Sequence, residues 1–180
     1  FGVGWTKVYL EKMAEFFASH GKTRFTVLRH FNIYGPYDKF DLAKGHVFAS
    51  SLLKVFQAQQ RNRSHIEAWG DGSDVRDFLH VEDLLHFLHV VLNHHDENNF
   101  QIFNLGSSEP ITIKKLLEKM IENTTPQLRI TWNSSMPSIG TSIVIDSEKA
   151  HKLGWKKKIT IEEGIRKTWK WLQENQEYLS

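Results

Sequence analysis

Residues 69–84 read WGDGSDVRDFLHVEDL, and this stretch carries the signals that decide the fold class. Its glycine- and aspartate-rich segment at 70–74 has the composition of a tight turn. A short β-rich run at 66–69 precedes the turn, and a helix is predicted over 81–93, where leucine and valine recur every three or four residues. A strand, a turn and an amphipathic helix in this order are typical of an α/β protein.

The rest of the chain repeats this alternation of helical and extended patterns. Further helices are predicted over 5–20, 46–60, 113–122, a brief segment that begins after Asp146 or Ser147 and ends at Gly154, and 160–179. Further extended segments are predicted over 25–28, 100–105, 128–131 and 142–145, and a polar loop over 37–45. The wide apolar arc of helix 5–20 indicates packing on two sides, and Thr160 and Glu163 have capping-box spacing.

Composition excludes several classes of protein. With 40% hydrophobic residues in 180, the chain can bury a sizeable core and is not disordered. It has no cysteine, which excludes disulfides and thiolate chemistry. A net charge of +2 and only short apolar runs give no reason to expect nucleic-acid binding or a membrane span. The KKK run at 156–158 is interpreted as a solvated corner.

The ten histidines do not have the spacing of a metal site. His86 and His89 lie three residues apart on one predicted helix, with His94, His95 and Asp96 just beyond it. No HExxH pattern and no carboxylate at ligand spacing accompanies them. We therefore expect no metal and interpret these residues as a polar helix flank.

Glycine motifs that cradle cofactor phosphates are missing from the sequence. Gly2 and Gly4, and likewise Gly70 and Gly72, begin a GxG pattern, but neither pair is completed to GxGxxG. A P-loop and a GxSxG elbow are absent as well.

Two segments carry candidate chemistry. Residues 29–36 (RHFNIYGP) form a strand end that turns through Asn and Gly-Pro, where ligand-facing loops lie in open α/β sheets. In residues 69–83, Trp69 and Arg76 flank the turn, and such a pair suits a stacked base and a clamped phosphate. From the residues alone, both segments are explained equally well as structural turns.

Four motifs resemble, in this order, the extended short-chain dehydrogenase/reductase family that acts on nucleotide sugars. They are NIYGP (32–36), WGDGSDVRDFLHVEDL (69–84), FNLGSSEPITI (103–113) and LGWKKKITIEEGIRKTWKWLQEN (153–175). Within this family, residues 34–56 (YGPYDKFDLAKGHVFASSLLKVF) resemble the branch of GDP-fucose synthases, which are 4-keto-6-deoxy-mannose epimerase/reductases. The resemblance covers essentially the whole chain.

The resemblance implies an α/β fold made of the C-terminal part of a Rossmann-like parallel sheet and a smaller α+β subdomain that binds nucleotide sugar. Residues 1–60 are expected to supply the last strand–helix units of the Rossmann-like domain, and 61–180 mostly the subdomain. A half with the glycine loop is expected to precede this chain. The resemblance also implies a cytoplasmic homodimer that pairs through helix 5–20 and binds neither nucleic acid nor membrane.

Cofactor and catalytic residues follow from the same resemblance. Lys7 matches the lysine of the YxxxK motif and would contact the ribose of NAD or NADP, while Val3 stands where the family has its catalytic tyrosine. A valine cannot exchange the proton that accompanies hydride transfer. The nicotinamide and sugar side of the cleft would be lined by His30, Phe31, Asn32 and Ile33. The alternative for Lys7 is an exposed helix lysine.

His46 matches the acid/base histidine of C3/C5 epimerisation and is expected to lie beside the cofactor as well. An imidazole suits proton exchange next to a ketone, although a solvated histidine at a helix start is the alternative. Asn32, Lys54, Trp69 and Arg76 match substrate-binding positions, the last three at the diphosphate. The basic residue usual in the family after the P-x-x-G-T stretch at 137–141 is missing, which weakens the diphosphate clamp or indicates a different sugar nucleotide.

The function implied is NAD(P)-dependent epimerisation and 4-keto reduction of an NDP-4-keto-6-deoxy sugar. A C4-epimerase or 4,6-dehydratase of the same family, which would not need His46, is one alternative. A catalytically degenerate partner that binds sugar nucleotide or dimerises is another. Because of Val3 and the missing glycine loop, the 180 residues alone are expected to be inactive.

Overall fold

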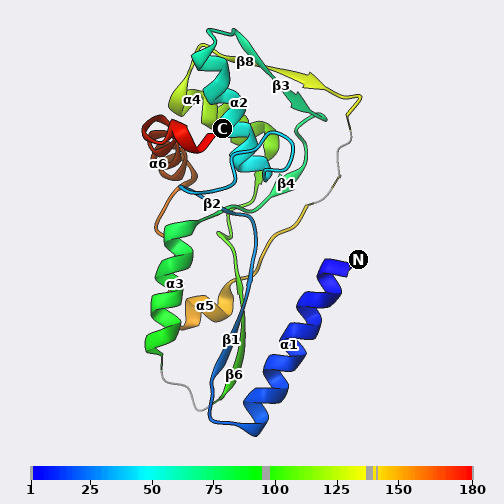
Figure 1. Cartoon of the computed structure of the whole chain (residues 1–180), viewed down its shortest axis with the longest axis vertical. Coiled ribbons are helices and arrows are strands. Elements are labelled where there is room, and N and C mark those ends of the chain that lie inside the picture. The colour runs from blue at the N-terminus through cyan, green and yellow to red at the C-terminus, as the bar shows by residue number, and fades with distance from the viewer. Residues whose placement is uncertain (1, 95–97, 137–139, 141, 180) are drawn as a thin grey trace.

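A computed structural model describes residues 2–94, 98–136, 140 and 142–179 of the chain, which form two lobes (Figure 1). What we call the strand-pair lobe contains α1 (Gly2–His20), β1 (Phe25–His30), α3 (Val81–Asn93), β6 (Phe100–Leu105) and α5 (Glu148–Lys152). What we call the helical lobe contains α2 (Val47–Gln60), β3 (His65–Trp69), α4 (Ile113–Thr124), β8 (Arg129–Asn133), α6 (Ile161–Glu174) and the 3₁₀ turn η1 (Gln176–Leu179). Four two-residue strands lie between the lobes: β2 (Ile33–Tyr34), β4 (Val75–Arg76), β5 (Leu79–His80) and β7 (Ile111–Thr112).

The strand-pair lobe is built on β1 and β6, which pair in parallel over six residues from Phe25 opposite Phe100 to His30 opposite Leu105. Helix α1 lies along one side of this pair, and α3 and α5 lie on the other (Figure 1). The core on the α3 side is aromatic: the ring of Phe87 meets those of Phe103 and Trp155 edge to face, at 5.2 and 5.7 Å between centroids. Because parallel strands bury both faces, this pair needs helices on both sides.

The helical lobe buries the apolar faces of α2, α4 and α6 against the parallel pair β3–β8. Leu52, Val55, Leu116, Ile165 and Leu172 in this cluster are fully buried. Gly164 on α6 is required by packing, since a Cβ there would collide with the phenol of Tyr34. Tyr34 thereby ties the segment between the lobes to the helical core.

The structure confirms the predicted α/β class and most of the predicted elements. One boundary was wrong: the last helix ends at Glu174 rather than near Leu179, and a 3₁₀ turn follows Asn175. In the predicted extended segment 142–145, Ser142 forms an isolated bridge to Val75 and the segment is not a strand. The Thr160 cap is confirmed, since its side chain accepts a hydrogen bond from the backbone N–H of Glu163.

Helix α1 packs on the strand pair and leaves much of its apolar arc exposed. Within the described chain Ala18 is its one buried residue, and Trp5, Tyr9, Phe16 and Phe17 are each more than half exposed. The second packing side predicted for this helix is therefore uncovered in the chain as described. No helix among the described residues is long and apolar enough to cross a bilayer.

Each hydrophobic cluster draws on residues from both sides of position 60. Helix α2 belongs to the helical lobe, whereas α3, β6 and α5 belong to the strand-pair lobe. The predicted division into 1–60 and 61–180 stays a prediction, and the chain itself crosses between the lobes several times (Figure 1).

Candidate functional site

The junction between the lobes lies where β1 and β6 end, and a buried carboxylate organises it. Asp77 Oδ1 accepts hydrogen bonds from the backbone N–H of Ser107 at 2.8 Å and from its hydroxyl at 2.5 Å, and Oδ2 accepts one from Ser108 N–H at 3.1 Å. Asn32 donates from Nδ2 to the carbonyl oxygen of Asp77 at 3.0 Å. Asp77 thus joins the segment after β1 to the segment after β6, a role that the sequence analysis missed.

Asn32, which was predicted to line the cleft, is partly buried and held by this network. The residues on either side of Asn32 differ in their contacts. Phe31 is partly buried and donates its N–H to Leu105, whereas Ile33 lies in β2 opposite Leu79 and packs against the core of the strand-pair lobe. Of the segment 30–33, Ile33 is therefore a core residue in this structure.

Lys7 and His30 interact across the gap between α1 and the end of β1. Partial burial lowers the pKa of the His30 imidazole, and the positive charge of Lys7 lowers it further. The predicted cofactor residues at 7 and 30 therefore share one neighbourhood. The position of Val3, one turn before Lys7 on α1, is exposed.

His46 stands at the start of α2 as its N-cap residue, with an extended backbone and an exposed side chain that forms no capping hydrogen bond. Its Nδ1 lies 3.9 Å from Oδ1 of Asp38, a carboxylate in the preceding loop. An exposed imidazole beside a carboxylate can act as an acid/base group, and the ring of His46 is accessible from solvent.

Lys54 lies on the same helix, about two turns after His46. Its ammonium donates to the carbonyl oxygen of Glu67 at 3.0 Å and lies 5.6 Å from the ring centroid of Trp69. Burial lowers the pKa of the Lys54 ammonium, against the opposing effect of the Glu67 carboxylate. A groove of about 450 Å³ opens beside Lys54 between α2 and β3, and Arg61 and Arg63 lie along it.

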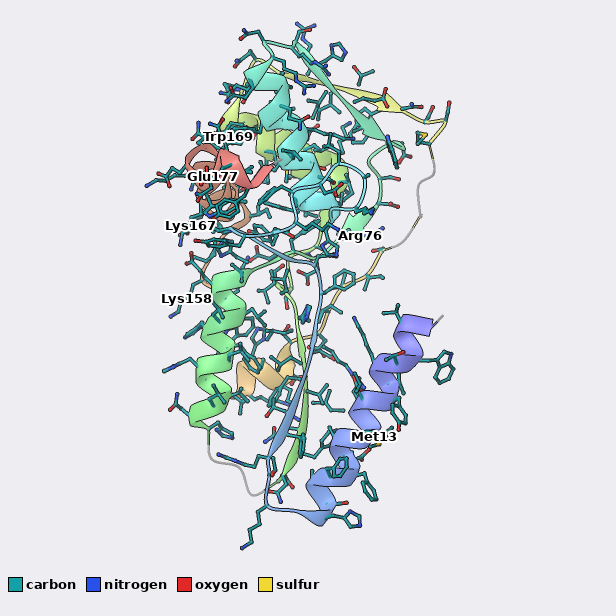
Figure 2. All side chains as sticks on the ribbon, viewed as in Figure 1. Met13, Arg76, Lys158, Lys167, Trp169 and Glu177 are labelled. Atoms are coloured by element: carbon teal, nitrogen blue, oxygen red, sulfur yellow. The ribbon has the colours of Figure 1, made fainter. Side chains whose placement is uncertain are left out.

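Arg76 lies in β4, and its side chain is only 14% exposed. Its guanidinium donates to the carbonyl oxygen of Val75 at 2.9 Å and approaches Asp74 Oδ2 at 3.4 Å. Figure 2 shows Arg76 on the side of the molecule where the N-terminal end of α1 lies. The structure therefore places Trp69 beside Lys54 and Arg76 beside Asp74.

The turn between Trp69 and Arg76 has the tight geometry that its composition predicted. Gly70 and Gly72 adopt left-handed φ values of 74° and 76°. A Cβ on Gly72 would collide with the indole of Trp132, so the turn also packs against β8. This close packing sets the direction in which the chain leaves the turn and enters β4.

No group of three potential metal ligands occurs in the part of the chain that the structure describes. Two of the histidine-region candidates, His95 and Asp96, lie outside the described residues. So does the P-x-x-G-T stretch at 137–141, except for Gly140, whose backbone N–H donates to Asp74 Oδ1 at 2.7 Å.

A pair of parallel strands flanked by helices, with a polar junction at the strand ends and a lobe of α+β character above it, defines a Rossmann-like class of protein. A family model described as the NAD dependent epimerase/dehydratase family matches residues 4–106, and the chain belongs to this family.

Among relatives, the chain is 35% identical over 144 residues to a probable GDP-L-fucose synthase 1 of Oryza sativa subsp. japonica, covering 80% of this chain and 43% of the relative. It is 28% identical over 153 residues to the GDP-L-fucose synthase of Escherichia coli strain K12, covering 81% and 48%. The chain therefore spans about half the length of the curated relatives it matches.

Solved structures agree with the fold. A GDP-L-fucose synthetase from Naegleria fowleri superposes with a TM-score of 0.85 over 96% of this chain and 54% of that one, and its 20% identity supports the fold alone. A UDP-glucose 4-epimerase with UDP-glucose from Thermotoga maritima superposes with a TM-score of 0.75 at 27% identity, over 95% and 52% of the chains.

Proposed function

We propose that this chain forms the substrate-binding portion of an NAD(P)-dependent epimerase/reductase that acts on an NDP-4-keto-6-deoxy sugar. The observation that carries the proposal is the placement of two groups on α2. His46 begins the helix and Lys54 follows about two turns later, which is about 12 Å along the helix axis. Lys54 is in turn held beside the exposed indole of Trp69. This spacing suits a ligand with a diphosphate at one end and a reacting sugar at the other.

The diphosphate end is proposed to lie at Lys54 and Trp69, with Arg76 nearby. The Lys54 ammonium supplies a point charge for a phosphate oxygen, and a guanidinium supplies two parallel N–H donors. Arg76 is occupied by Asp74 and by the carbonyl oxygen of Val75. We infer that a bound diphosphate takes the place of one of these acceptors.

The sugar end is proposed to lie at His46. Epimerisation next to a ketone breaks a C–H bond on one face of the carbon and forms one on the other, and the ketone oxygen holds the electron pair as an enolate in between. The imidazole takes up or supplies the proton on its own face, and a second acid/base group acts on the opposite face. The exposed side chain of His46 is open to a sugar ring, whereas the histidine at position 80 is buried and is not.

The residues of this chain fit only the nicotinamide end of the cofactor. Lys7 and His30 share one neighbourhood at the end of β1, while the sequence contains no glycine loop for the pyrophosphate. When bound, the cofactor supplies the hydride for 4-keto reduction. In this chain Lys7 would bind and orient its ribose, and Val3 provides no group to exchange the accompanying proton.

Two observations favour other candidate functions. Similarity at 27% identity to a UDP-glucose 4-epimerase favours a C4-epimerase or 4,6-dehydratase, in which His46 has no acid/base role. Val3 at the family's tyrosine position favours a degenerate partner that binds sugar nucleotide without turnover.

Calorimetry on the 180-residue chain tests the proposal. We expect GDP or a GDP-sugar to bind, and Lys54→Ala to weaken that binding, while Lys44→Ala, an exposed lysine of the 37–45 loop, leaves it unchanged. NADPH is expected not to bind in the low micromolar range. Absence of nucleotide binding, or equal affinity in the two lysine variants, would contradict the proposed diphosphate site.

A further inference from the structure

The carboxylate of Asp38 is mostly buried, and only one of its two oxygens accepts a hydrogen bond from a described residue. Its side chain is 13% exposed, and Oδ1 accepts a hydrogen bond from the backbone N–H of Lys39 at 2.7 Å. The other oxygen, Oδ2, is buried and accepts no hydrogen bond from any residue that the structure describes. The oxygen that His46 approaches is Oδ1, which can accept a second hydrogen bond beside the one from Lys39.

The loop that carries Asp38 is fixed to the helical lobe. Tyr37 adopts a left-handed φ of 65°, an uncommon value outside glycine that persists where packing maintains it. The ring of Tyr37 lies 4.9 Å from that of Trp171 on α6, and the ring of Phe40 stacks on the same indole at 5.4 Å. These contacts hold the backbone on both sides of Asp38.

The rest of the loop is braced up to His46. Asp41 Oδ1 accepts hydrogen bonds from the N–H groups of Ala43 and Lys44, and Asp41 O accepts one from Gly45 at 2.9 Å. The approach of Asp38 to His46 is therefore set by backbone that is fixed at both ends. The imidazole itself is 79% exposed, and its nearest described polar partner is Asp38, at 3.9 Å from Nδ1.

We propose that Asp38 is a positioning residue for His46: its carboxylate accepts the Nδ1–H of the imidazole and leaves Nε2 to exchange a proton with substrate. The inference rests on the proposed acid/base role of His46. A small rotation of the exposed imidazole closes the 3.9 Å separation to hydrogen-bond distance. A neutral imidazole carries one N–H, so fixing it at Nδ1 places the lone pair at Nε2.

In this arrangement Nε2 takes the proton from one face of a carbon beside the ketone, whose oxygen holds the electron pair as an enolate, and a second acid/base group supplies a proton on the other face. The imidazolium formed in between is stabilised by the Asp38 carboxylate at Nδ1. The proton count at Nδ1 does not change, because Asp38 orients the ring without taking its proton.

A purely structural role for Asp38 makes a different prediction. A carboxylate near the N-terminal end of α2 stabilises the helix dipole, and its loss would lower stability without any effect on the ring of His46. The tautomer of His46 therefore separates the two roles.

The test is ¹⁵N NMR of the 180-residue chain with labelled histidine, at a mildly alkaline pH where imidazoles are neutral. The His46→Gln spectrum assigns the His46 signals among the ten histidines. We expect the Nδ1–H tautomer to predominate in the wild type and the Nε2–H tautomer in Asp38→Ala. Glu118→Ala, which removes an exposed carboxylate on α4 instead, should keep the wild-type tautomer.

A wild-type His46 that is mainly in the Nε2–H form overturns the inference by itself, whether or not the Asp38 variants fold. An unchanged tautomer in a folded Asp38→Ala or Asp38→Asn chain overturns it as well. In a protein that also carries a glycine-loop half, Asp38→Ala should lower kcat for epimerisation about 10- to 100-fold with little change in KM, less than loss of the acid/base group itself costs. If His46→Ala kept epimerisation, the proposed function would fail while the tautomer result stood.

Discussion

At the scale of single residues, the junction depends on polar groups whose partners are far away in the sequence. Asp77 and Ser107 are 30 positions apart and both buried, yet they form the contact that joins the ends of β1 and β6. No local pattern around Asp77 indicates this partner, so the contact was not predictable from the sequence. The contact of Arg76 with Asp74 and that of Trp69 with Lys54 were likewise not predicted, and a shared ligand site for Trp69 and Arg76 stays a prediction.

His80 gives the protein a titrating group whose burial favours the neutral form. Its Nδ1 accepts a hydrogen bond from Glu82 N–H and caps α3, and burial lowers its pKa. Lys167 lowers this pKa as well, while Glu82, Asp83 and Glu163 oppose the shift. Because the pKa of His80 is lower in the folded state, the unfolded chain binds a proton at higher pH than the folded chain does. The stability that neutral His80 contributes is therefore complete above pH about 6.5 and is lost as the pH falls further.

We therefore expect His80→Asn, which retains a capping side chain, to reduce the loss of stability between neutral and mildly acidic pH. Urea unfolding of both proteins at several pH values measures this change. An identical pH dependence in the variant would show that His80 is not the responsible group.

At the scale of elements, the longer helices and strands followed from the sequence, whereas the two-residue strands β2, β4, β5 and β7 did not. Apolar periodicity predicted α3 over Val81–Asn93 and β6 over Phe100–Leu105, both as observed. Residues 142–145 have high β propensity, but a strand needs a neighbour to complete its hydrogen bonds, and only Ser142 has one. Among the candidate site residues, Ile33 is partly buried against a hydrophobic core, which no local pattern predicted.

The close contact of α6 with Tyr34 predicts a position-specific effect of an added methyl group. We expect Gly164→Ala to destabilise the protein by about 1–3 kcal/mol, because its Cβ meets the phenol ring. Gly4→Ala on α1 is the matched control, since no atom lies within 4 Å of the added Cβ. It should stabilise by roughly 0.5–1 kcal/mol through helix propensity. Thermal unfolding measures the Tm of both variants. Equal shifts in Tm would show that the contact with Tyr34 does not restrict the size of the residue at position 164.

At the scale of the whole molecule, α1 presents a broad apolar surface and the strand pair β1–β6 presents open edges. Trp5, Tyr9, Leu10, Phe16 and Phe17 are all exposed on α1. Surfaces of this kind cause association, and unpaired strands add to it. We propose that a second copy of this chain covers α1.

The isolated chain is accordingly expected to self-associate. Sedimentation velocity over a range of concentrations should show a rising apparent mass, and Phe16→Glu should reduce it because a charge then lies within the apolar surface. A monomer that is independent of concentration at tens of micromolar would argue against association through α1.

The central claim is that this chain binds the sugar nucleotide while the cofactor phosphates bind elsewhere. It is tested most directly by measuring both affinities for Arg76→Ala in a protein that also carries the glycine-loop half. Loss of a charge-assisted contact to a phosphate costs about 1.5–3 kcal/mol, so the Kd for the nucleotide sugar should rise roughly 10- to 100-fold. The Kd for NADP should hardly change, and His46→Ala should leave both values near those of the wild type. An Arg76→Ala protein that bound both ligands equally weakly, or both as well as before, would contradict the account.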